Sequence, residues 1–237
     1  MSELFPTKTI ALEYLHCTDA SREYEFNHWC NRVYLPNNLS TPGVVNIYRY
    51  RNVAKELRDG QARYLNIYRI ISCDPLSVAL AIKGKSRQLG VNAQIPEYYR
   101  FYFLTAWDFL TYRHTVANPQ PYKQLPDGMP EAMLVVPSIC TDLNREADFN
   151  EWYLYTHHHD LLETPGLVQT HRYVNVDPNY TQEEGKYLAL YEIDAEDPAE
   201  VVRKILEDDR NVRIPQGRMI NCIRATYGFG TYQHIDI

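Results

Sequence analysis

The chain carries two copies of one pattern, and this repeat constrains the fold more than any other feature of the sequence. CTDASREYEFNHWCNRVYLPNNLSTPGVVNIYRYRNV begins at Cys17, and CTDLNREADFNEWYLYTHHHDLLETPGLVQTHRYVNV begins at Cys140. A constant offset of 123 residues aligns the two stretches without a gap, and both contain Trp, Thr-Pro-Gly and Arg-Tyr at the same points. Because each copy specifies a similar structural unit, the chain is expected to fold as two equivalent halves.

Each copy predicts the same order of strands and helices. In the second copy, a strand over 133–140 is followed by Thr141-Asp142, which supplies capping side chains for a helix that ends at Thr164-Pro165-Gly166. Further segments are expected as strands at 167–174 and 187–193, a helix opened by Pro198, and a last strand at 219–226. The first copy gives the corresponding segments 9–17, 44–50, 64–70, 75–89 and 101–107.

The order β-α-β-β-α-β, present twice, predicts the fold class. It is α+β, with two ferredoxin-like βαββαβ repeats packed sheet to sheet into one barrel-like body, a dimer fused into a single chain. Packing the sheets together is expected because each would otherwise expose a large apolar face. The proline-rich stretch NPQPYKQLPDGMP marks the boundary. We therefore expect a first repeat at 1–117, a linker at 118–131 and a second repeat at 132–237.

Charge and composition exclude several classes of partner. The formal charge is −6 and no Lys/Arg cluster is present, which argues against nucleic acid and anionic membranes as partners. Apolar runs fall far short of the roughly 20 residues of a membrane helix. The first residues, MSELFPTKTI, lack the layout of a secretory signal. Five cysteines without a C-x-x-C pair favour a reducing compartment, so a cytoplasmic protein is expected.

Common catalytic motifs are also missing. The sequence contains no G-x-G-x-x-G, P-loop, G-x-S-x-G or H-E-x-x-H, so dinucleotide binding, phosphoryl transfer and serine or zinc hydrolysis have no support. The abundant tyrosines, 20 in all, suit sheet positions and the lining of a pocket for an aromatic or apolar ligand. A small-molecule substrate is the expected partner, with the chain acting as a monomeric pseudo-dimer or a homodimer of it.

The segment FNEWYLYTHHHDLLETPGLVQTHRY resembles the EthD-like branch of the dimeric α+β barrel superfamily. That branch carries a helix with W-Y-x-x-x-H and an acidic-aliphatic end, then P-G and an R-Y strand. The matching residues are Trp152, Tyr153, His157, Asp160, Leu161, Leu162, Pro165, Gly166, Arg172 and Tyr173. The resemblance implies a small-molecule site, but superfamily members include cofactor-free monooxygenases, isomerases, polyketide cyclases, hydroxynitrile lyases and haem enzymes, so the fold does not select a reaction.

The first copy departs from this motif, because Tyr34 occupies the position of His157. The second copy is therefore the expected working half, and the first copy is a scaffold. His157 is predicted to transfer a proton, since an imidazole with a pKa of about 6.5 can accept and return one near neutrality. The alternative is a histidine that caps the helix C-terminus. His158 and His159 are expected to be solvated.

Tyr153 and Arg172 are predicted to stabilise negative charge on a substrate oxygen. The alternatives are a core tyrosine and an arginine paired with a local carboxylate, Asp142 for Arg172 and Asp19 for its counterpart Arg49. Substrate contacts are predicted for Trp152, His171, Tyr173, Phe149 and Tyr34.

No cofactor and no metal are predicted. Neighbouring helix residues point about 100° apart, so His157, His158 and His159 cannot share one ion. A site that combines one of them with His171, for a metal or haem, stays open at this stage.

The predicted function is a cofactor-independent acid/base enzyme of the lyase, dehydratase, isomerase or cyclase type, acting on a small apolar, aromatic or polyketide-like molecule. The alternatives are a cofactor-free monooxygenase on a phenolic substrate and a non-catalytic small-molecule-binding pseudo-dimer.

Overall fold

The structure is a computed structural model that describes residues 9–17, 19–88, 100–106, 112–113, 129–175, 177, 180, 182 and 185–235. The first part of the chain forms β1 (Thr9–Leu15), α1 (Glu23–Trp29), α2 (Leu35–Leu39), β2 (Val44–Asn52), β3 (Tyr64–Ile70), α3 (Pro75–Gln88), β4 (Arg100–Ala106) and β5 (Tyr112–Arg113). The second part forms β6 (Ala132–Cys140), α4 (Glu146–Trp152), α5 (His158–Leu162), β7 (Leu167–Asn175), β8 (Tyr187–Ile193), α6 (Pro198–Asp208), β9 (Ile223–Ala225) and β10 (Gly230–His234). Most of the predicted linker lies outside the described residues.

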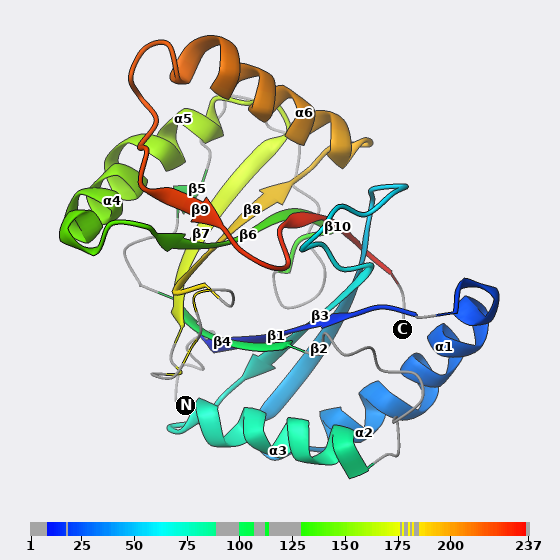
Figure 1. Cartoon of the computed structure of the whole chain (residues 1–237). Coiled ribbons are helices and arrows are strands. Elements are labelled where there is room, and N and C mark those ends of the chain that lie inside the picture. The colour runs from blue at the N-terminus through cyan, green and yellow to red at the C-terminus, as the bar shows by residue number, and fades with distance from the viewer. Residues whose placement is uncertain are drawn as a thin grey trace, which may run out of the picture.

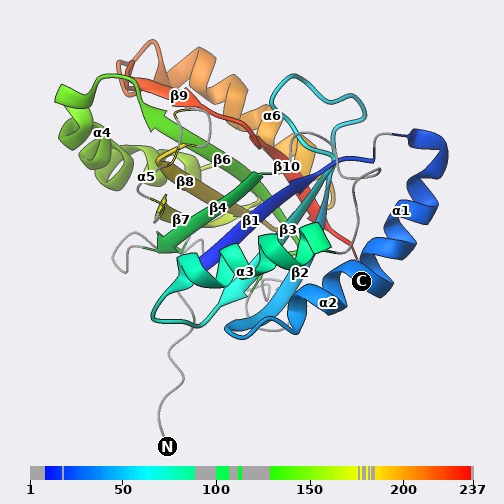
Figure 2. The same cartoon turned by 60° about the horizontal axis from the view of Figure 1, so that its bottom comes forward.

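The strands form one antiparallel sheet that closes into a ring. In the first half the hydrogen-bonded order is β2-β3-β1-β4, and in the second half it is β7-β8-β6. The last strand of each half pairs with the other half, because β4 pairs with β7 while β10 pairs with both β6 and β2. Figure 2 shows β4 lying between β1 and β7. The expected α+β class is confirmed.

Helices cover the outside of this ring on two sides. Figure 1 shows α1, α2 and α3 on one side of the strands and α4, α5 and α6 on the other. The structure has three apolar cores: one inside the ring, formed by strands of both halves, and one beneath each group of helices. Within β8, Leu188 and Leu190 face the ring interior while Tyr187, Ala189 and Tyr191 face the helices, so the strand is buried throughout. No helix among the described residues is both long and apolar enough to cross a membrane.

The predicted helix caps are present. The Asp19 carboxylate accepts a hydrogen bond from the Ser21 backbone N–H at 2.9 Å, and Asp142 accepts one from the Asn144 N–H at 3.1 Å. Asp197 accepts from the N–H groups of Ala199 and Glu200 ahead of α6. Each first helix thus begins at the same position of the repeat.

The predicted last strand over 219–226 is wrong in extent. The structure has two short strands there, β9 and β10, separated by a bend at Gly228, which has a φ of +93°. A Cβ at Gly228 would lie 2.2 Å from the Tyr14 ring, so a side chain is excluded at this bend. The bend lets β9 pair with the end of β6 and carries β10 across to β2.

The two Thr-Pro-Gly turns end the first helix of each half by the same geometry. Gly43 and Gly166 have φ values of +94° and +89°, which favour glycine. The carbonyl oxygen of Gly166 accepts a hydrogen bond from Asp194 N–H at 2.9 Å, and a Cβ there would lie 2.9 Å from Val201 Cγ2. At Gly166, the end of α5, the start of β7 and the helix α6 therefore pack too closely to leave room for a side chain.

Gly166→Ala should lower the free energy of unfolding by clearly more than Gly60→Ala. Both positions have positive φ, which makes alanine unfavourable by roughly 1–2 kcal/mol. Only at Gly166 must Val201 also move, since nothing lies within 4 Å of a Cβ at Gly60. Urea denaturation of the two variants measures the difference. Equal losses would contradict the close packing described at the second turn.

Candidate functional site

The helix that carries the predicted site is not a regular α-helix. Between α4 and α5, residues Tyr153–His157 form a π turn, in which the N–H of His158 donates to the carbonyl of Tyr153 five residues earlier. The first half has a π turn at the corresponding residues, Cys30–Tyr34. In a regular α-helix, side chains five positions apart point about 140° away from each other. The π turn instead brings them onto one face.

The π turn places the His157 imidazole on the Trp152 indole. The two ring centroids lie 4.3 Å apart with an angle of 24° between the planes, which is a stacked arrangement. Trp29 and Tyr34 make the equivalent contact in the first half, at 5.0 Å and 32°. In a regular helix, His157 would lie one turn after Tyr153 but would not stack on Trp152. The recurrence of Trp followed five residues later by a ring in both copies was the sequence signal for this contact.

His157 lies in an apolar, aromatic environment. Its exposed fraction is 7%. The rings of Tyr153 and Tyr191 meet it edge to face at 5.0 and 6.2 Å. Burial lowers the pKa of His157 well below its usual range, and His158, Arg213 and Arg172 lower this pKa further. The imidazole is therefore neutral at physiological pH, and its Nδ1 atom has no hydrogen-bond partner within the described part of the chain.

Two buried phenols, Tyr153 and Tyr191, lie next to this imidazole, and a third buried hydroxyl, that of Ser138, lies next to the Tyr153 hydroxyl. Tyr153 interacts with Ser138 and Tyr191, yet none of the three hydroxyls makes a hydrogen bond of ordinary geometry to a described residue. Burial raises the pKa of Tyr153 and of Tyr191, so both phenols stay protonated and can donate. Buried polar atoms are almost always hydrogen-bonded in folded proteins. Such a concentration of unmet donors and acceptors is characteristic of a site that receives a polar group from a ligand.

Arg172 lies beneath this aromatic cluster. Its exposed fraction is 1%, and its Nη2 donates to Asn150 Oδ1 at 2.7 Å. The guanidinium carbon lies 4.0 Å from the centroid of the Tyr153 ring and 4.6 Å from that of Tyr187, close enough for cation–π attraction. Its positive charge lowers the pKa of Tyr153, opposing the effect of burial. Arg172 acts on the site through the Tyr153 ring.

The predicted pairing of the two arginines with aspartates is wrong. Arg49 donates to Asn27 and Asn31, both at 2.7 Å, and Arg172 donates to Asn150. Asp19 and Asp142 instead cap the helix starts. Amide oxygens and aromatic rings take the place of a carboxylate because both guanidinium groups lie inside the layer between helix and sheet.

Not all predicted site residues come together. Phe149 and Trp152 lie with His157, Tyr153 and Arg172 between the helices and the sheet, where Phe149 contacts the Tyr153 ring at 5.1 Å. His171 and Tyr173 lie on the opposite face of β7 and point into the ring interior, since alternate residues of a strand face opposite sides. There the His171 Nε2 atom lies 2.5 Å from Glu192 Oε1. Tyr34 lies in the other half of the molecule.

The histidine triplet divides between core and surface. His158 is fully buried, so the prediction that it is solvated is wrong, whereas His159 is exposed as expected. The combination of a triplet histidine with His171, for a metal or haem, stays a prediction, and His171 projects to the ring-interior face of β7. Across the described ranges, no group of three or more His, Cys, Asp and Glu side chains is arranged to hold a metal ion.

The first half fills the equivalent position with a complete polar network. The Glu13 carboxylate, fully buried, accepts hydrogen bonds from the hydroxyls of Tyr34 and Tyr68 and from the Asn66 amide. Ser86 lies 2.8 Å from the Tyr34 hydroxyl.

At the 123-residue offset, Val136 replaces Glu13 and His157 replaces Tyr34, while Tyr191 corresponds to Tyr68. The second half has therefore lost the central carboxylate and kept a phenol. Sequence reasoning missed Glu13, Tyr191 and Ser138, although the exchange of Glu13 for Val136 was visible in the aligned strands.

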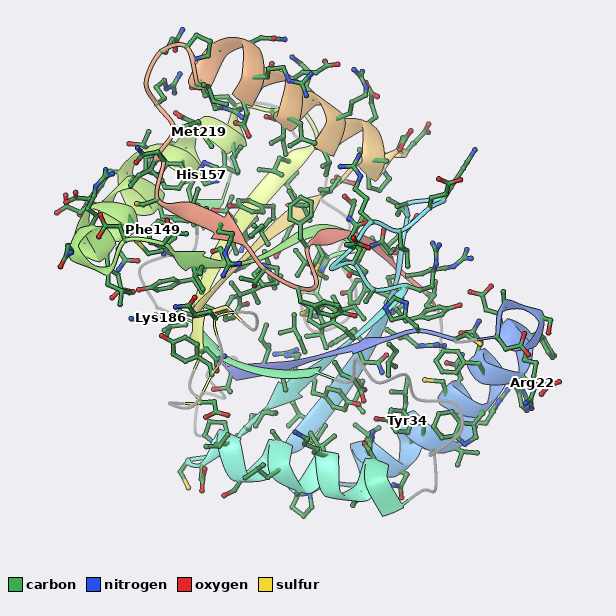
Figure 3. The ribbon with its side chains drawn as sticks, in the orientation of Figure 1. Arg22, Tyr34, Phe149, His157, Lys186 and Met219 are labelled. Atoms are coloured by element: carbon green, nitrogen blue, oxygen red, sulfur yellow. The ribbon has the colours of Figure 1, made fainter. Side chains whose placement is uncertain are left out.

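A segment that follows α6 covers the outer edge of the site. The Trp152 indole N–H donates to the carbonyl of Arg218 at 2.7 Å, and the Arg218 guanidinium forms an ion pair with the buried Asp160. Arg213 donates to the carbonyl of Asp160 at 2.9 Å. Figure 3 labels Met219 of this segment together with His157 and Phe149 on the helix side of the second half. These contacts close the site over the imidazole.

Comparisons with known proteins identify the fold. No family model matches the sequence, and no curated protein is similar to it. Among solved structures, an anthrone oxidase-like protein aligns with a TM-score of 0.60 and 14% identity over 98% of this chain and 93% of that chain. A mutant chlorite dismutase from Candidatus Nitrospira defluvii aligns with a TM-score of 0.56 and 10% identity, over 98% and 94% of the two chains.

A candidate monooxygenase from Fusobacterium nucleatum aligns with a TM-score of 0.54 and 8% identity, over 98% and 94% of the two chains. These proteins belong to the dimeric α+β barrel superfamily. At such identities the likeness establishes the fold alone, and this chain has a dimeric α+β barrel fold.

His158→Leu, which introduces the residue found at position 35 of the first copy, should make stability less dependent on acid. Burial lowers the pKa of His158 to about 3, so the folded protein keeps this group neutral while the unfolded chain protonates it below about pH 6.5. The free energy of unfolding therefore falls as the pH falls, by up to about 1.4 kcal/mol per pH unit for this one group. The variant should lack this contribution to the pH dependence.

Urea denaturation between pH 6.5 and 4.5 measures this slope. His159→Leu is the matched control, because its side chain is exposed and should leave the slope unchanged. An unchanged slope for His158→Leu would contradict the neutral buried state.

Proposed function

We propose that this protein is a cofactor-independent acid/base enzyme that acts on a small apolar, aromatic or polyketide-like molecule, with His157 as the proton-transfer residue. The observation that supports this proposal most strongly is the neutral imidazole, stacked on Trp152, with its Nδ1 unpartnered beside the phenols of Tyr153 and Tyr191. A neutral imidazole accepts a proton, and protonated phenols donate hydrogen bonds to an oxygen.

The proposed mechanism divides the work between these groups. His157 removes a proton from a carbon next to a carbonyl, and Tyr153 donates a hydrogen bond to the enolate oxygen that forms. Arg172, held 4.0 Å from the centroid of the Tyr153 ring, makes that phenol a stronger donor by its charge. The enolate also stabilises the imidazolium beside it, which offsets the low pKa that burial gives His157. Return of the proton to another atom completes an isomerisation, an elimination or a ring closure.

The aromatic surroundings support the substrate class. Rings of Trp152, Tyr153 and Tyr191 contact the imidazole, with Phe149 against Tyr153, and flat apolar molecules pack well against such rings. The segment through Arg218 must then open for entry, since it closes the outer edge of the site.

The chain architecture belongs to the same proposal. We infer a fused pseudo-dimer of two ferredoxin-like repeats, of the EthD-like kind, in which the second repeat carries the working site. The 123-residue offset and the matched π turns support this inference.

A second candidate is a cofactor-free monooxygenase on a phenolic or anthrone-like substrate. The similarity in fold to an anthrone oxidase-like protein is the observation that favours it. The first step would be the same, because His157 would form the phenolate or enolate, which then reacts with dioxygen. For anthrone itself the balance is one anthrone and one dioxygen giving one anthraquinone and one water.

His157→Asn should reduce proton transfer by about 100-fold or more, the contribution of a positioned general base. Anthrone is a suitable probe because its CH2 group is acidic through the enol. Exchange of these hydrogens in D2O under nitrogen, followed by NMR, measures proton transfer alone. Oxygen uptake and anthraquinone formation in air measure oxygenation.

His159→Asn is the matched control and should retain the wild-type rate. Exchange in the wild type no faster than in buffer would contradict the acid/base proposal for this substrate class, and binding of anthrone without turnover would favour the non-catalytic alternative. The visible spectrum of the purified protein is recorded first, because a Soret band would assign a histidine to haem ligation.

A further inference from the structure

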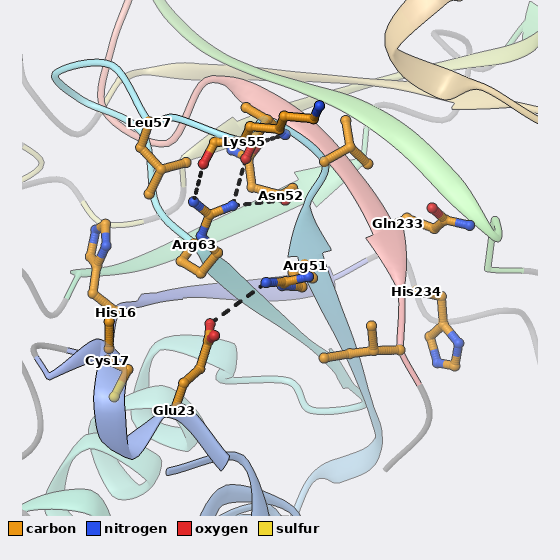
Figure 4. Close-up of a pocket in the computed structure, with 14 residues that line it drawn as sticks. His16, Cys17, Glu23, Arg51, Asn52, Lys55, Leu57, Arg63, Gln233 and His234 are labelled. Atoms are coloured by element: carbon orange, nitrogen blue, oxygen red, sulfur yellow. Dashed lines mark hydrogen bonds and ion pairs between the residues drawn. The ribbon is translucent and has the colours of Figure 1, made fainter.

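A separate cavity lies in the first half, at the end of the ring where β1, β2 and β10 finish. Its volume is about 780 Å³, within the roughly 300–1,000 Å³ typical of ligand pockets. Figure 4 shows the side chains that line it, which come from the end of β1, the start of the first helix, the loop after β2 and the end of β10. None of the residues predicted for the His157 site is among them. We call this cavity the basic pocket, because Arg51, Lys55 and Arg63 line it. Its other titratable lining residues include Glu23, His16 and His234.

Positive charge exceeds negative charge in the basic pocket. Three of its described lining residues, Arg51, Lys55 and Arg63, carry permanent cations, whereas Glu23 is the single carboxylate among them. This excess occurs in a chain with a formal charge of −6. A local concentration of cations in an acidic protein attracts an anion.

Glu23 pairs with Arg51, and within the described part of the chain Arg63 and Lys55 have no carboxylate partner. The Arg63 guanidinium donates to the main-chain carbonyls of Asn52, Ala54 and Lys55 at 3.3, 2.6 and 2.9 Å. Carbonyl oxygens are neutral acceptors, so these bonds fix the loop without cancelling the charge. Glu23 accepts a hydrogen bond from the Tyr64 hydroxyl at 2.6 Å and lies 3.8 Å from Arg51.

The second half provides an internal comparison. At the 123-residue offset, Glu146 and Lys186 occupy the positions of Glu23 and Arg63, and they form a direct ion pair at 2.8 and 2.9 Å. In the first half Arg63 turns to the loop carbonyls instead.

The other cationic positions are also particular to the first half. Val174 stands at the position of Arg51, and Pro178 at that of Lys55. The common scaffold therefore does not require a cation at either position.

Apolar side chains supply another part of the lining. Val53, Leu57 and Ile235 line the pocket together with the charged groups. Such a combination suits a ligand with one charged end and one apolar part, because an inorganic ion would leave the apolar surface uncovered.

We propose that the basic pocket binds a small organic anion, a carboxylate whose head lies between Arg51 and Lys55 and whose apolar body contacts Val53 and Leu57. This inference is independent of the proposed activity at His157. Arg51 has a side chain that is 52% exposed and Lys55 is exposed, so both can reorient onto the bound carboxylate.

Isothermal titration calorimetry at low ionic strength tests the proposal, with octanoate, octan-1-ol and inorganic phosphate as probes. Octanoate should bind at least tenfold more tightly than octan-1-ol, and added salt should weaken its binding. Arg51→Gln combined with Lys55→Gln should weaken octanoate binding at least tenfold. Arg210→Gln, which removes an exposed positive charge outside the pocket, should leave it unchanged.

Several results would overturn the proposal. They are equal binding of octanoate and octan-1-ol, no binding of octanoate, binding of phosphate without octanoate, or an equal loss in Arg210→Gln. Lys55→Gln alone provides a second variant, because an exposed loop side chain can be replaced without loss of folding. His157→Asn should bind octanoate as the wild type does, so failure of the proposed activity and failure of this pocket are distinguishable.

Discussion

Backbone hydrogen bonds between the two halves are the constraint on which the rest of the molecule depends. The pairing of β4 with β7 and of β10 with β2 removes the open edges that each half would otherwise expose. It also gives the ring a shared interior, so a strand such as β8 has one face toward that interior and the other toward the helices. A side chain near the middle of such a strand therefore faces either the shared interior or the layer beneath one helix group. The His157 site lies in the second of these.

Much of this architecture could be predicted from the sequence because it depends on repeated local signals. Asp19 and Asp142 each precede a helix and cap it, and Gly43 and Gly166 each end that helix with a positive φ. These devices act over a few residues, so a single sequence reveals them. The antiparallel α+β fold then follows from the order of elements, since bare sheets need covering. The burial of His157 could be expected because its side chain lies on the face of the helix that packs against the sheet.

The parts that could not be predicted depend on geometry that the sequence does not encode locally. The π turn lets His157 stack on Trp152, five residues earlier, where an α-helix would favour a residue four positions earlier. The sequence WYLYTH is equally compatible with an α-helix. His171 and Tyr173 were grouped with Arg172, although the alternation of a strand sends neighbours to opposite faces. At the Gly228 bend, a side chain is excluded by the ring of Tyr14, more than 200 residues away in the chain. Long-range contacts of this kind form only in the folded barrel, so the local sequence does not reveal them.

The asymmetry between the halves has a physical origin in the single chain. A symmetric homodimer would repeat every substitution in both subunits, so a buried Glu13 network and a His157 site could not coexist. In one chain, the first half holds a buried carboxylate, Glu13, that accepts hydrogen bonds from protein groups. The second half then tolerates buried hydroxyls and an imidazole without such partners, each of which lowers stability by about 1–3 kcal/mol. The two halves thus place different polar groups at one position of the fold, a hydrogen-bonded carboxylate network in the first and an imidazole beside two phenols in the second.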